Sequence, residues 1–258
     1  MRFERISEKQ LEIFRFIREP YTALICDGAV RTGKTVLMTA AFLEWSMHAF
    51  SGMRFAVCGK TVRSAERNII EPLLALSSVA KKYRLRYSRS LSLLTAELGG
   101  RKNFYYVFGG RDESSYMLIQ GMTLAGILLD ETALMPRSFV EQAVTRTLSV
   151  DGAKLWFNCN PASPSHWFYR EWILKAEERG AKRLHFLLED NPGLSERAIE
   201  RAKASFSGVF YDRYILGKWV AAEGLVYPRA ADGEGIVPNE PREYTRFAVS
   251  VDYGTLNP

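Results

Sequence analysis

Apolar residues along this chain fall into two patterns, short β-prone runs and longer stretches with helical spacing. The short runs predict strands at residues 21–26, 54–58, 125–129 and 154–157. Helical spacing predicts helices at residues 34–50, 61–75, 138–149, 166–178, 195–205 and 208–216, and Pro72 should kink or stop the second of these. Because strands alternate with helices, we expect an α/β fold in which a mostly parallel sheet is flanked by helices.

Two regions add to this alternating body. Ahead of it, residues 7–10 have the pattern of a capping box, and the helix that follows should end at Pro20. Later, β-prone pieces separated by turn-like residues predict a small antiparallel insertion, with strands at 84–87, 92–96 and 104–108.

The C-terminal part of the chain differs from the rest in composition. Residues 224–244 are rich in glycine, proline and charge, which predicts a linker, and residues 247–251 then begin a new apolar strand. We therefore expect three parts, a main α/β domain over 1–190, a linker or lid subdomain over 191–244 and the first strand of a second domain over 245–258.

Composition narrows the class of protein. The chain has 258 residues, of which 47% are hydrophobic and 25% charged, values that exclude a disordered or fibrous protein. Its net charge of +6 is compatible with a polyanionic partner such as nucleic acid but does not establish one. The three cysteines show no metal-ligand spacing and indicate buried thiols in an intracellular protein, and no segment has the length of a bilayer span.

The run GAVRTGKT carries the strongest chemical signal. It matches G-x-x-x-x-G-K-[ST] between an expected strand and an expected helix, where backbone N–H groups and the helix N-terminus can bind phosphate. Lys34 should reach the β- and γ-phosphates of a nucleotide, and Thr35 should offer its hydroxyl to Mg²⁺. The expected nucleotide-binding residues in this run are Gly28, Ala29, Val30, Arg31, Thr32, Gly33, Lys34 and Thr35.

A second signal is the pair of carboxylates that follows the strand at 125–129. The end of a strand in an open α/β sheet is where ligands bind, so both carboxylates should lie near the phosphates. Asp130 would hold Mg²⁺ through its water shell, and Glu131 would polarise the attacking water. A glutamate in that place favours hydrolysis over phosphoryl transfer to a substrate hydroxyl.

A third strand also ends in polar side chains. Asn158 and Asn160 follow the strand at 154–157, and an amide there can lie near the γ-phosphate and report hydrolysis. Asn-Pro pairs are equally common turn formers, so the sequence leaves a sensor and a simple turn as alternatives.

Five segments in this order resemble the large subunit of tailed-phage and prophage terminases: GAVRTGKT, GILLDETALMP, FNCNPASPSHWFYREW, GVFYDRYILGKWVAAEGLVYP and VSVDYGTLNP. The resemblance spans nearly the whole chain. It implies a P-loop NTPase fold of the RecA-like, additional-strand type, and a motor that uses ATP and Mg²⁺ to drive double-stranded DNA into a capsid. It further implies a homo-oligomeric ring on a portal, a terminase small subunit as partner, no membrane, and the cytoplasm of an infected or lysogenic bacterial host.

The resemblance also assigns roles to single residues. Lys34 and Thr35 match the family's phosphate and Mg²⁺ ligands, and Asp130 and Glu131 match its Mg²⁺ carboxylate and catalytic base. The stretch 159–161 corresponds to the motif that couples hydrolysis to subdomain movement.

Two further matches leave alternatives open. Arg31 occupies the place of an arginine that contacts the γ-phosphate, and its plainer interpretation is an exposed loop residue. Gln10 resembles an adenine-reading glutamine, because an amide can pair with adenine, but it also fits as the last residue of the capping box.

The sequence departs from the family at one position. Some terminases carry an arginine that acts in a neighbouring subunit's site just ahead of the acidic strand, where this chain has Gln120. If such an arginine acts in trans, Arg111, Arg137 or Arg146 must supply it.

The ending of the chain predicts an incomplete nuclease. Asp252 matches the aspartate that opens the family's nuclease domain, but the six residues after it contain no further acidic ligand for a two-metal site. We therefore expect this chain by itself not to cut DNA.

Other functions and features stay open at this stage. A DNA helicase or remodelling ATPase shares the glycine-rich loop and the acidic strand, and a nucleotide-gated DNA-binding protein with little turnover needs only the loop. The stretch 81–87 mixes cations and aromatic rings, as a nucleic-acid groove or a solvated strand face would. The tryptophans at 156, 167, 172 and 219 are expected to be core or interdomain anchors.

Overall fold

A single mixed sheet organises the domain. The computed structural model of the chain describes residues 5–221. The strands lie in the order β3-β4-β5-β2-β6-β7-β1-β8, and those from β5 to β8 run parallel. Their bounds are β1 (Ala23–Gly28), β2 (Arg54–Gly59), β3 (Arg84–Ser88), β4 (Leu93–Leu98), β5 (Arg101–Gly109), β6 (Gly126–Leu129), β7 (Lys154–Asn158) and β8 (Ala181–Phe186).

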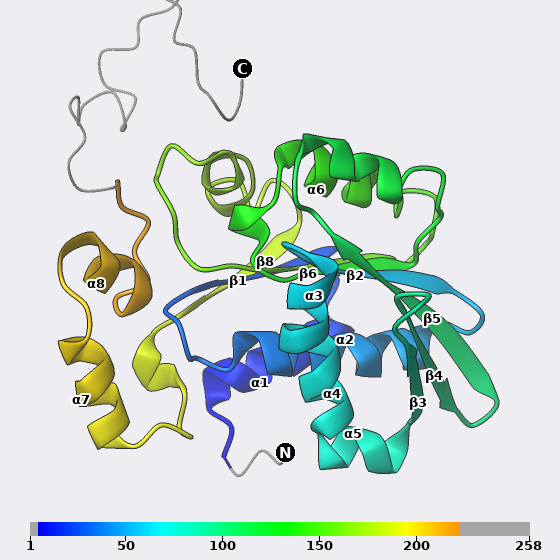
Figure 1. Cartoon of the computed structure of the whole chain (residues 1–258), viewed down its shortest axis with the longest axis horizontal. Coiled ribbons are helices and arrows are strands. Elements are labelled where there is room, and N and C mark those ends of the chain that lie inside the picture. The colour runs from blue at the N-terminus through cyan, green and yellow to red at the C-terminus, as the bar shows by residue number, and fades with distance from the viewer. Residues whose placement is uncertain (1–4, 222–258) are drawn as a thin grey trace, which may run out of the picture.

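Helices cover both faces of this sheet (Figure 1). The larger core lies under α1 (Glu8–Arg15), α2 (Lys34–Ala49), α4 (Glu71–Ala75) and α5 (Ser77–Lys82). The opposite core lies under α6 (Arg137–Thr145) and the π-helical turn η5 (Tyr169–Ile173). Alternate residues of β1 enter the two cores, Leu24 and Cys26 the first and Ala23 and Ile25 the second, as the period of a strand requires. The predicted α/β architecture is confirmed.

The order of the central strands identifies the type of P-loop fold. Strand β7 lies between β1, which leads into the GAVRTGKT loop, and β6, which ends at Asp130. This is the extra strand that the additional-strand class inserts between those two elements, so that prediction is also confirmed. It brings the carboxyl ends of β1, β7 and β6 side by side.

Several elements differ from the sequence-based expectations. The helix expected at 61–75 consists of α3 (Val62–Ala65), a π-helical turn η2 (Glu66–Ile70) and α4. The pattern of helical hydrogen bonds therefore changes just before Pro72. The expected helix at 166–178 is for the most part a π-turn followed by irregular turns. Helix α5 and strand β8 were not predicted. The antiparallel piece is no separate insertion, because β5 pairs in parallel with β2 and extends the main sheet.

Short 3-10 turns and two small helices complete the described part. The turns are η1 (Phe16–Arg18), η3 (Glu113–Leu118), η4 (Thr132–Leu134) and η6 (Leu188–Asp190). Helices α7 (Glu196–Ala204) and α8 (Gly208–Tyr214) pack on the start of the GAVRTGKT loop through a core that contains Ala29, Leu188 and Ile215. The proposed boundaries of the three domains stay a prediction, and the expected linker at 224–244 and strand at 247–251 lie outside the described residues.

The aromatic rings of the basic stretch at 81–87 are engaged within the protein. Tyr83 is only 5% exposed and donates its hydroxyl proton to Glu44, and the half-buried Tyr87 donates to Glu66. The exposed Arg84 fits the solvated strand face, and contact of this stretch with DNA stays a prediction. Trp156 and Trp172 are buried as expected, and no helix within residues 5–221 combines the length and apolarity of a membrane span.

Candidate active site

The GAVRTGKT loop joins β1 to α2 and leaves the start of that helix open to a ligand. Gly33 precedes the helix with a left-handed φ of 81° and gives it no side-chain cap. The first N–H groups of α2 therefore have neither an intrahelical acceptor nor a capping side chain, which is the arrangement that binds anions. Arg31 also takes a left-handed φ of 61°, and its exposed side chain lies at the rim of the cavity described below.

The first half of the loop is bonded to protein instead. The Ala29 N–H donates to the Phe186 carbonyl at 2.7 Å, and the Val30 N–H donates to the Tyr214 carbonyl at 3.0 Å. Strand β8 and the end of α8 thus hold this half in place. The N–H groups that stay open to an anion therefore lie in the second half of the loop, and Gly28 and Ala29 act as structural supports in this structure.

Lys34 lies almost completely buried at the first position of α2. Its ammonium donates to the Ala29 carbonyl at 2.5 Å, the Thr32 hydroxyl at 3.2 Å and the Asn160 side-chain oxygen at 3.3 Å. Burial lowers the pKa of Lys34. The loop oxygens nevertheless surround a cation here, and Asn160 reaches that cation from the segment after β7.

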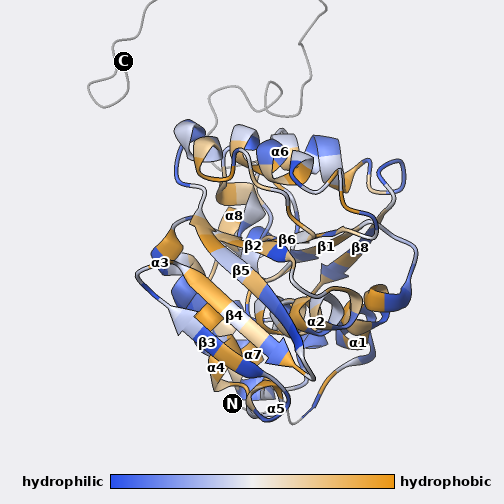
Figure 2. Cartoon of the chain, turned by 90° about the vertical axis from the view of Figure 1, so that its right-hand side faces the viewer, coloured by the Kyte–Doolittle hydropathy of each residue, from blue (hydrophilic) through white to orange (hydrophobic). Residues whose placement is uncertain are grey.

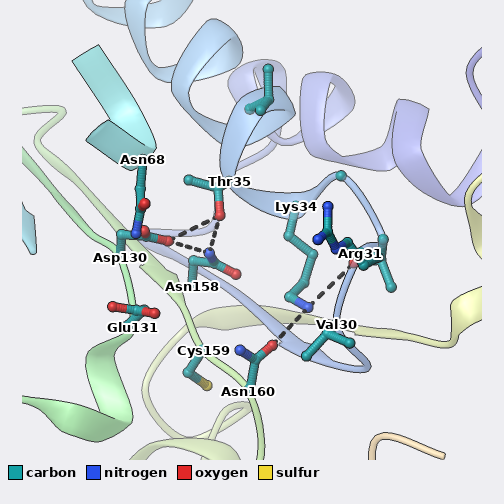
Figure 3. Close-up of a pocket in the computed structure, with 13 residues that line it drawn as sticks. Val30, Arg31, Lys34, Thr35, Asn68, Asp130, Glu131, Asn158, Cys159 and Asn160 are labelled. Carbon is teal, nitrogen blue, oxygen red and sulfur yellow. Dashed lines mark hydrogen bonds between the residues drawn. The ribbon is translucent and has the colours of Figure 1, made fainter. Parts of the chain in front are cut away.

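The start of α2 and the ends of β6 and β7 place Thr35, Asp130 and Asn158 in mutual contact (Figure 3). The Thr35 hydroxyl donates to Asp130 Oδ1 at 3.0 Å, and the Asn158 amide donates to Thr35 Oγ1 at 2.8 Å and also to Asp130. Within residues 5–221, Asn158 Oδ1 is a buried acceptor that has no hydrogen-bond partner. Burial raises the pKa of Asp130 despite these amide and hydroxyl donors. A carboxylate, a hydroxyl and an unpaired amide oxygen fit Mg²⁺, which prefers oxygen ligands.

Glu131 is held in a left-handed conformation, with φ of 58°, at the turn after β6. Its side chain is half-buried, and burial together with the neighbouring Asp130 charge raises its pKa, against the opposing charge of Arg67. A higher pKa makes a carboxylate a stronger base, which is the property that a general base needs.

These groups line one cavity of about 210 Å³. The sequence-predicted residues that line it are Val30, Arg31, Thr32, Gly33, Lys34, Thr35, Asp130, Glu131, Asn158 and Asn160. Gly28, Ala29 and Gln10 do not line it, and Asp252 lies outside the described residues. Asn68 and Cys159 line it too, and sequence reasoning did not identify Asn68 because it belongs to no recognised motif.

Gln10 combines the capping role with a contact to the phosphate loop. Its Oε1 accepts from the Ser7 N–H at 3.0 Å while the Ser7 hydroxyl accepts from the Gln10 N–H at 3.2 Å, so the capping box is confirmed. Its Nε2 donates to the Thr32 carbonyl at 2.9 Å, which ties the amide to the GAVRTGKT loop. Contact with adenine stays a prediction.

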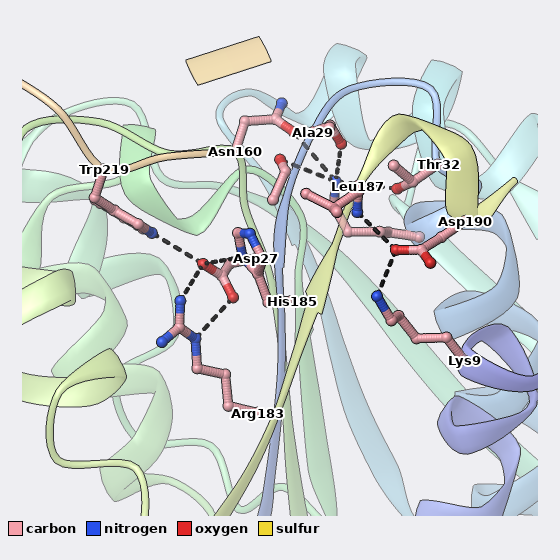
Figure 4. Close-up of polar contacts among 12 residues, drawn as sticks. Lys9, Asp27, Ala29, Thr32, Asn160, Arg183, His185, Leu187, Asp190 and Trp219 are labelled. Atoms are coloured by element: carbon pink, nitrogen blue, oxygen red, sulfur yellow. Dashed lines mark hydrogen bonds and ion pairs between the residues drawn. The ribbon is translucent and has the colours of Figure 1, made fainter. Parts of the chain in front are cut away.

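A buried carboxylate just before the loop was also missed by sequence reasoning. Asp27 is fully buried on β1 and accepts two hydrogen bonds of 2.9 Å from Arg183, one of 2.9 Å from the Trp219 indole and one of 3.3 Å from His185 (Figure 4). Burial raises the pKa of Asp27, but the His185, Arg183 and Trp219 hydrogen bonds and the Arg183 charge outweigh it, and the pKa falls to about 2. The cluster fastens β8 and the segment after α8 to the strand that carries the loop.

Comparison with known proteins agrees with this geometry. A family model described as terminase large subunit, T4likevirus-type, N-terminal, matches residues 25–231. The large terminase of a thermophilic bacteriophage is 46% identical over 98% of this chain and 63% of its own, with a TM-score of 0.82. The complex of that terminase with ADP gives 45% identity, the same coverage and a TM-score of 0.81.

A more distant structure shares the fold. The large terminase ATPase domain of Thermus phage P74-26 is 16% identical, with a TM-score of 0.61 over 84% of this chain and 100% of its own. No curated protein matches. This chain spans less than two thirds of the length of the thermophilic-phage terminase. With a matching family model over most of its length and a relative of 46% identity, the chain belongs to the terminase large subunits and represents their N-terminal part.

Proposed function

We propose that this chain is the ATP-hydrolysing part of a motor that translocates double-stranded viral DNA into a capsid. The observation that carries the proposal is the contact among Thr35, Asp130 and Asn158 beside a half-buried Glu131, at the end of a P-loop sheet. Membership in the terminase large subunits supports the packaging role, and the ADP complex of the thermophilic-phage terminase supports a nucleotide in this cavity.

The side chains divide the chemistry of hydrolysis among them. Lys34 places a cation near the phosphate oxygens, where it stabilises charge that develops on the transferred phosphoryl group. Glu131 accepts a proton from the attacking water, and Arg31 at the rim can add a second positive charge. Thr35, Asp130 and Asn158 would hold Mg²⁺, and the bound ion would neutralise negative charge on the phosphates. Asn160, which contacts Lys34, is placed to link the phosphate end to the segment after β7.

Partners follow from the same family membership. We infer a homo-oligomeric ring on a portal, double-stranded DNA as the translocated substrate and a terminase small subunit, in the cytoplasm of an infected or lysogenic bacterial host. The three-part division at residues 190 and 244, and a nuclease site that begins at Asp252, belong to the same proposal. Arg111 and Arg137 are both exposed and Arg146 is half-buried; Arg111 is the first candidate for an arginine in trans, because Arg137 is paired with Glu141.

Steady-state ATP hydrolysis tests the site. The wild-type chain should hydrolyse ATP, Lys34→Ala should lose most of that activity, and Glu131→Gln should bind ATP but hydrolyse it at least about a hundredfold more slowly. Asp130→Asn should weaken Mg²⁺-dependent nucleotide binding. The matched control is Lys102→Ala, which removes an exposed lysine on β5 outside the cavity and should leave the rate unchanged.

Assays with DNA distinguish the alternative functions. A helicase should unwind a forked duplex and a nucleotide-gated binding protein should show affinity without turnover, whereas the motor should hydrolyse ATP and leave the fork paired. Retention of full activity in Lys34→Ala or Glu131→Gln would contradict the proposed site.

A further inference from the structure

The helical segment that follows β2 is held unusually close to the active-site edge of the sheet. It begins with a capping box in which Thr61 and Ser64 exchange side-chain to backbone hydrogen bonds of 2.9 and 3.0 Å. A Cβ on Gly59 would lie 2.9 Å from the Ala65 nitrogen, and one on Gly109 would lie 2.8 Å from the Val62 nitrogen. Only glycine at both strand ends allows this approach, so the start of the segment is fixed against the sheet.

A π-helical turn in this segment separates a buried face from a polar one. In η2, Ile69 and Ile70 are each only 1% exposed and belong to the larger core. The preceding Asn68 instead lines the nucleotide cavity. Such turns occur mostly as single inserted residues in α-helices, frequently at functional sites, because the extra residue turns one side chain out of the regular ladder.

The contacts of Asn68 define which way its amide faces. Arg67 donates from Nε to Asn68 Oδ1 at 3.2 Å, which uses the amide oxygen and leaves the amide N–H groups to donate elsewhere. These N–H groups lie on the side of the Asp130 carboxylate, which is next to the Asn68 side chain in Figure 3 and whose pKa the Asn68 amide lowers. The Asp130 carboxylate therefore accepts a hydrogen bond from the Asn158 amide of β7 and has a second amide, that of Asn68, beside it in the same cavity.

We propose that Asn68 is a positioning residue of the ATPase site, which fixes the Asp130 carboxylate in the orientation that serves Mg²⁺-nucleotide. Arg67 supports it in two ways, by holding the Asn68 amide oxygen and by placing a positive charge near Glu131. This inference rests on the proposed function and adds a residue from outside the glycine-rich loop, the acidic strand and the strand-end asparagines.

The expected effect is a change in how strongly Mg²⁺ promotes nucleotide binding. Removal of a residue that orients a metal ligand typically costs about 10- to 100-fold in metal affinity or activity. Asn68→Ala should therefore raise the Mg²⁺ concentration for half-maximal tight ADP binding by about tenfold or more and lower the hydrolysis rate similarly. Affinity for ADP without Mg²⁺ should stay at the wild-type value, because Asn68 belongs to η2 and not to the GAVRTGKT loop.

The experiment is a titration of MgCl₂ into the chain with a fluorescent ADP, followed by hydrolysis assays on the same samples. Arg67→Ala, at an exposed position, should shift the Mg²⁺ midpoint in the same direction by a smaller factor, which provides a second variant if Asn68→Ala folds poorly. Arg63→Ala is the matched control, since Arg63 is an exposed residue of the same segment outside the cavity. Its midpoint should equal that of the wild type.

The outcomes separate this inference from the proposed function. An unchanged Mg²⁺ midpoint in Asn68→Ala would overturn the positioning role, and so would an equal loss of ADP binding with and without Mg²⁺, which would indicate a general defect of the cavity. A wild-type chain that fails to hydrolyse ATP would contradict the proposed function, while the Mg²⁺ dependence of ADP binding would still test Asn68.

Discussion

Replacement of Asp27 by asparagine should destabilise the domain by several kcal/mol. The substitution keeps the shape of the side chain but removes its negative charge. That charge is fully buried on β1, where Arg183, His185 and Trp219 all contact it. Removal of one partner of a buried ion pair costs about 3–5 kcal/mol, because the other charge is left without compensation. The Arg183 side chain retains 34% exposure, so water offsets part of that cost and we expect a value of about 3 kcal/mol.

The pKa of Asp27 gives an independent magnitude and a pH window. Its shift from 3.8 in an unfolded chain to about 2 in the fold corresponds to about 2 kcal/mol of stabilisation at neutral pH. Since the folded pKa is the lower one, this stabilisation is complete above about pH 5 and is lost as the pH falls toward 2. The stability difference between wild type and Asp27→Asn should shrink over the same interval.

Thermal unfolding followed by circular dichroism measures both effects. A loss of about 3 kcal/mol should lower the melting temperature of a domain of this size by about 6–12 °C. Glu71→Gln, which removes an exposed partner of Arg89, is the control and should change stability by less than about 1 kcal/mol. The double variant Asp27→Asn with Arg183→Met should recover part of the loss, because no unpaired charge remains. An unchanged melting temperature in Asp27→Asn, or a difference that persists undiminished as the pH falls toward 2, would refute the reasoning.

Other changes test the remaining contacts. Gln10→Ala should cost about 1 kcal/mol of stability through the lost capping box, and a competition assay should show a reduced preference for ATP over GTP if the amide reads adenine. Asn158→Ala should weaken Mg²⁺-dependent nucleotide binding and lower hydrolysis at least about tenfold, since the Thr35 and Asp130 side chains lose their shared donor. Specific activity should rise with protein concentration and lose that dependence in Arg111→Glu, as expected of an arginine in trans; a fast rate independent of concentration would instead indicate a self-sufficient site.

The glycine-rich loop and the acidic strand were predictable because their chemistry requires fixed spacing in the sequence. A phosphate-binding loop needs a lysine at the start of a helix, and the carboxylates need a buried strand directly before them. The structure places Lys34, Thr35, Asp130 and Glu131 around one cavity, as those rules imply. The motor function and the roles of the other site residues came from the family resemblance, because the periodicity of the sequence carries no information about them.

Strand β8 could not be recognised because its polar residues are paired with carboxylates of other elements. Lys182 contacts Glu12 and Glu19, and Arg183 contacts Asp27, so a six-residue strand with two cations has the composition of a surface loop. Its partners lie far away in the sequence. Asn68 was missed for a related reason. A π-turn changes which helix positions share a face, and the hydrophobic pattern of the sequence does not indicate where such a turn occurs.

Within residues 5–221, β3 is the outermost strand at one edge of the sheet, and its side chains protect that edge against aggregation. Arg84 and Arg86 are exposed on this outermost strand, beside the largely hydrophobic β4 (Figure 2). If two molecules were to join their β3 edges in antiparallel fashion, arginines would face arginines, and like charges opposite each other destabilise such a pair. The cations at 84 and 86 therefore oppose the growth of one sheet into another, which matters most where many copies are crowded together.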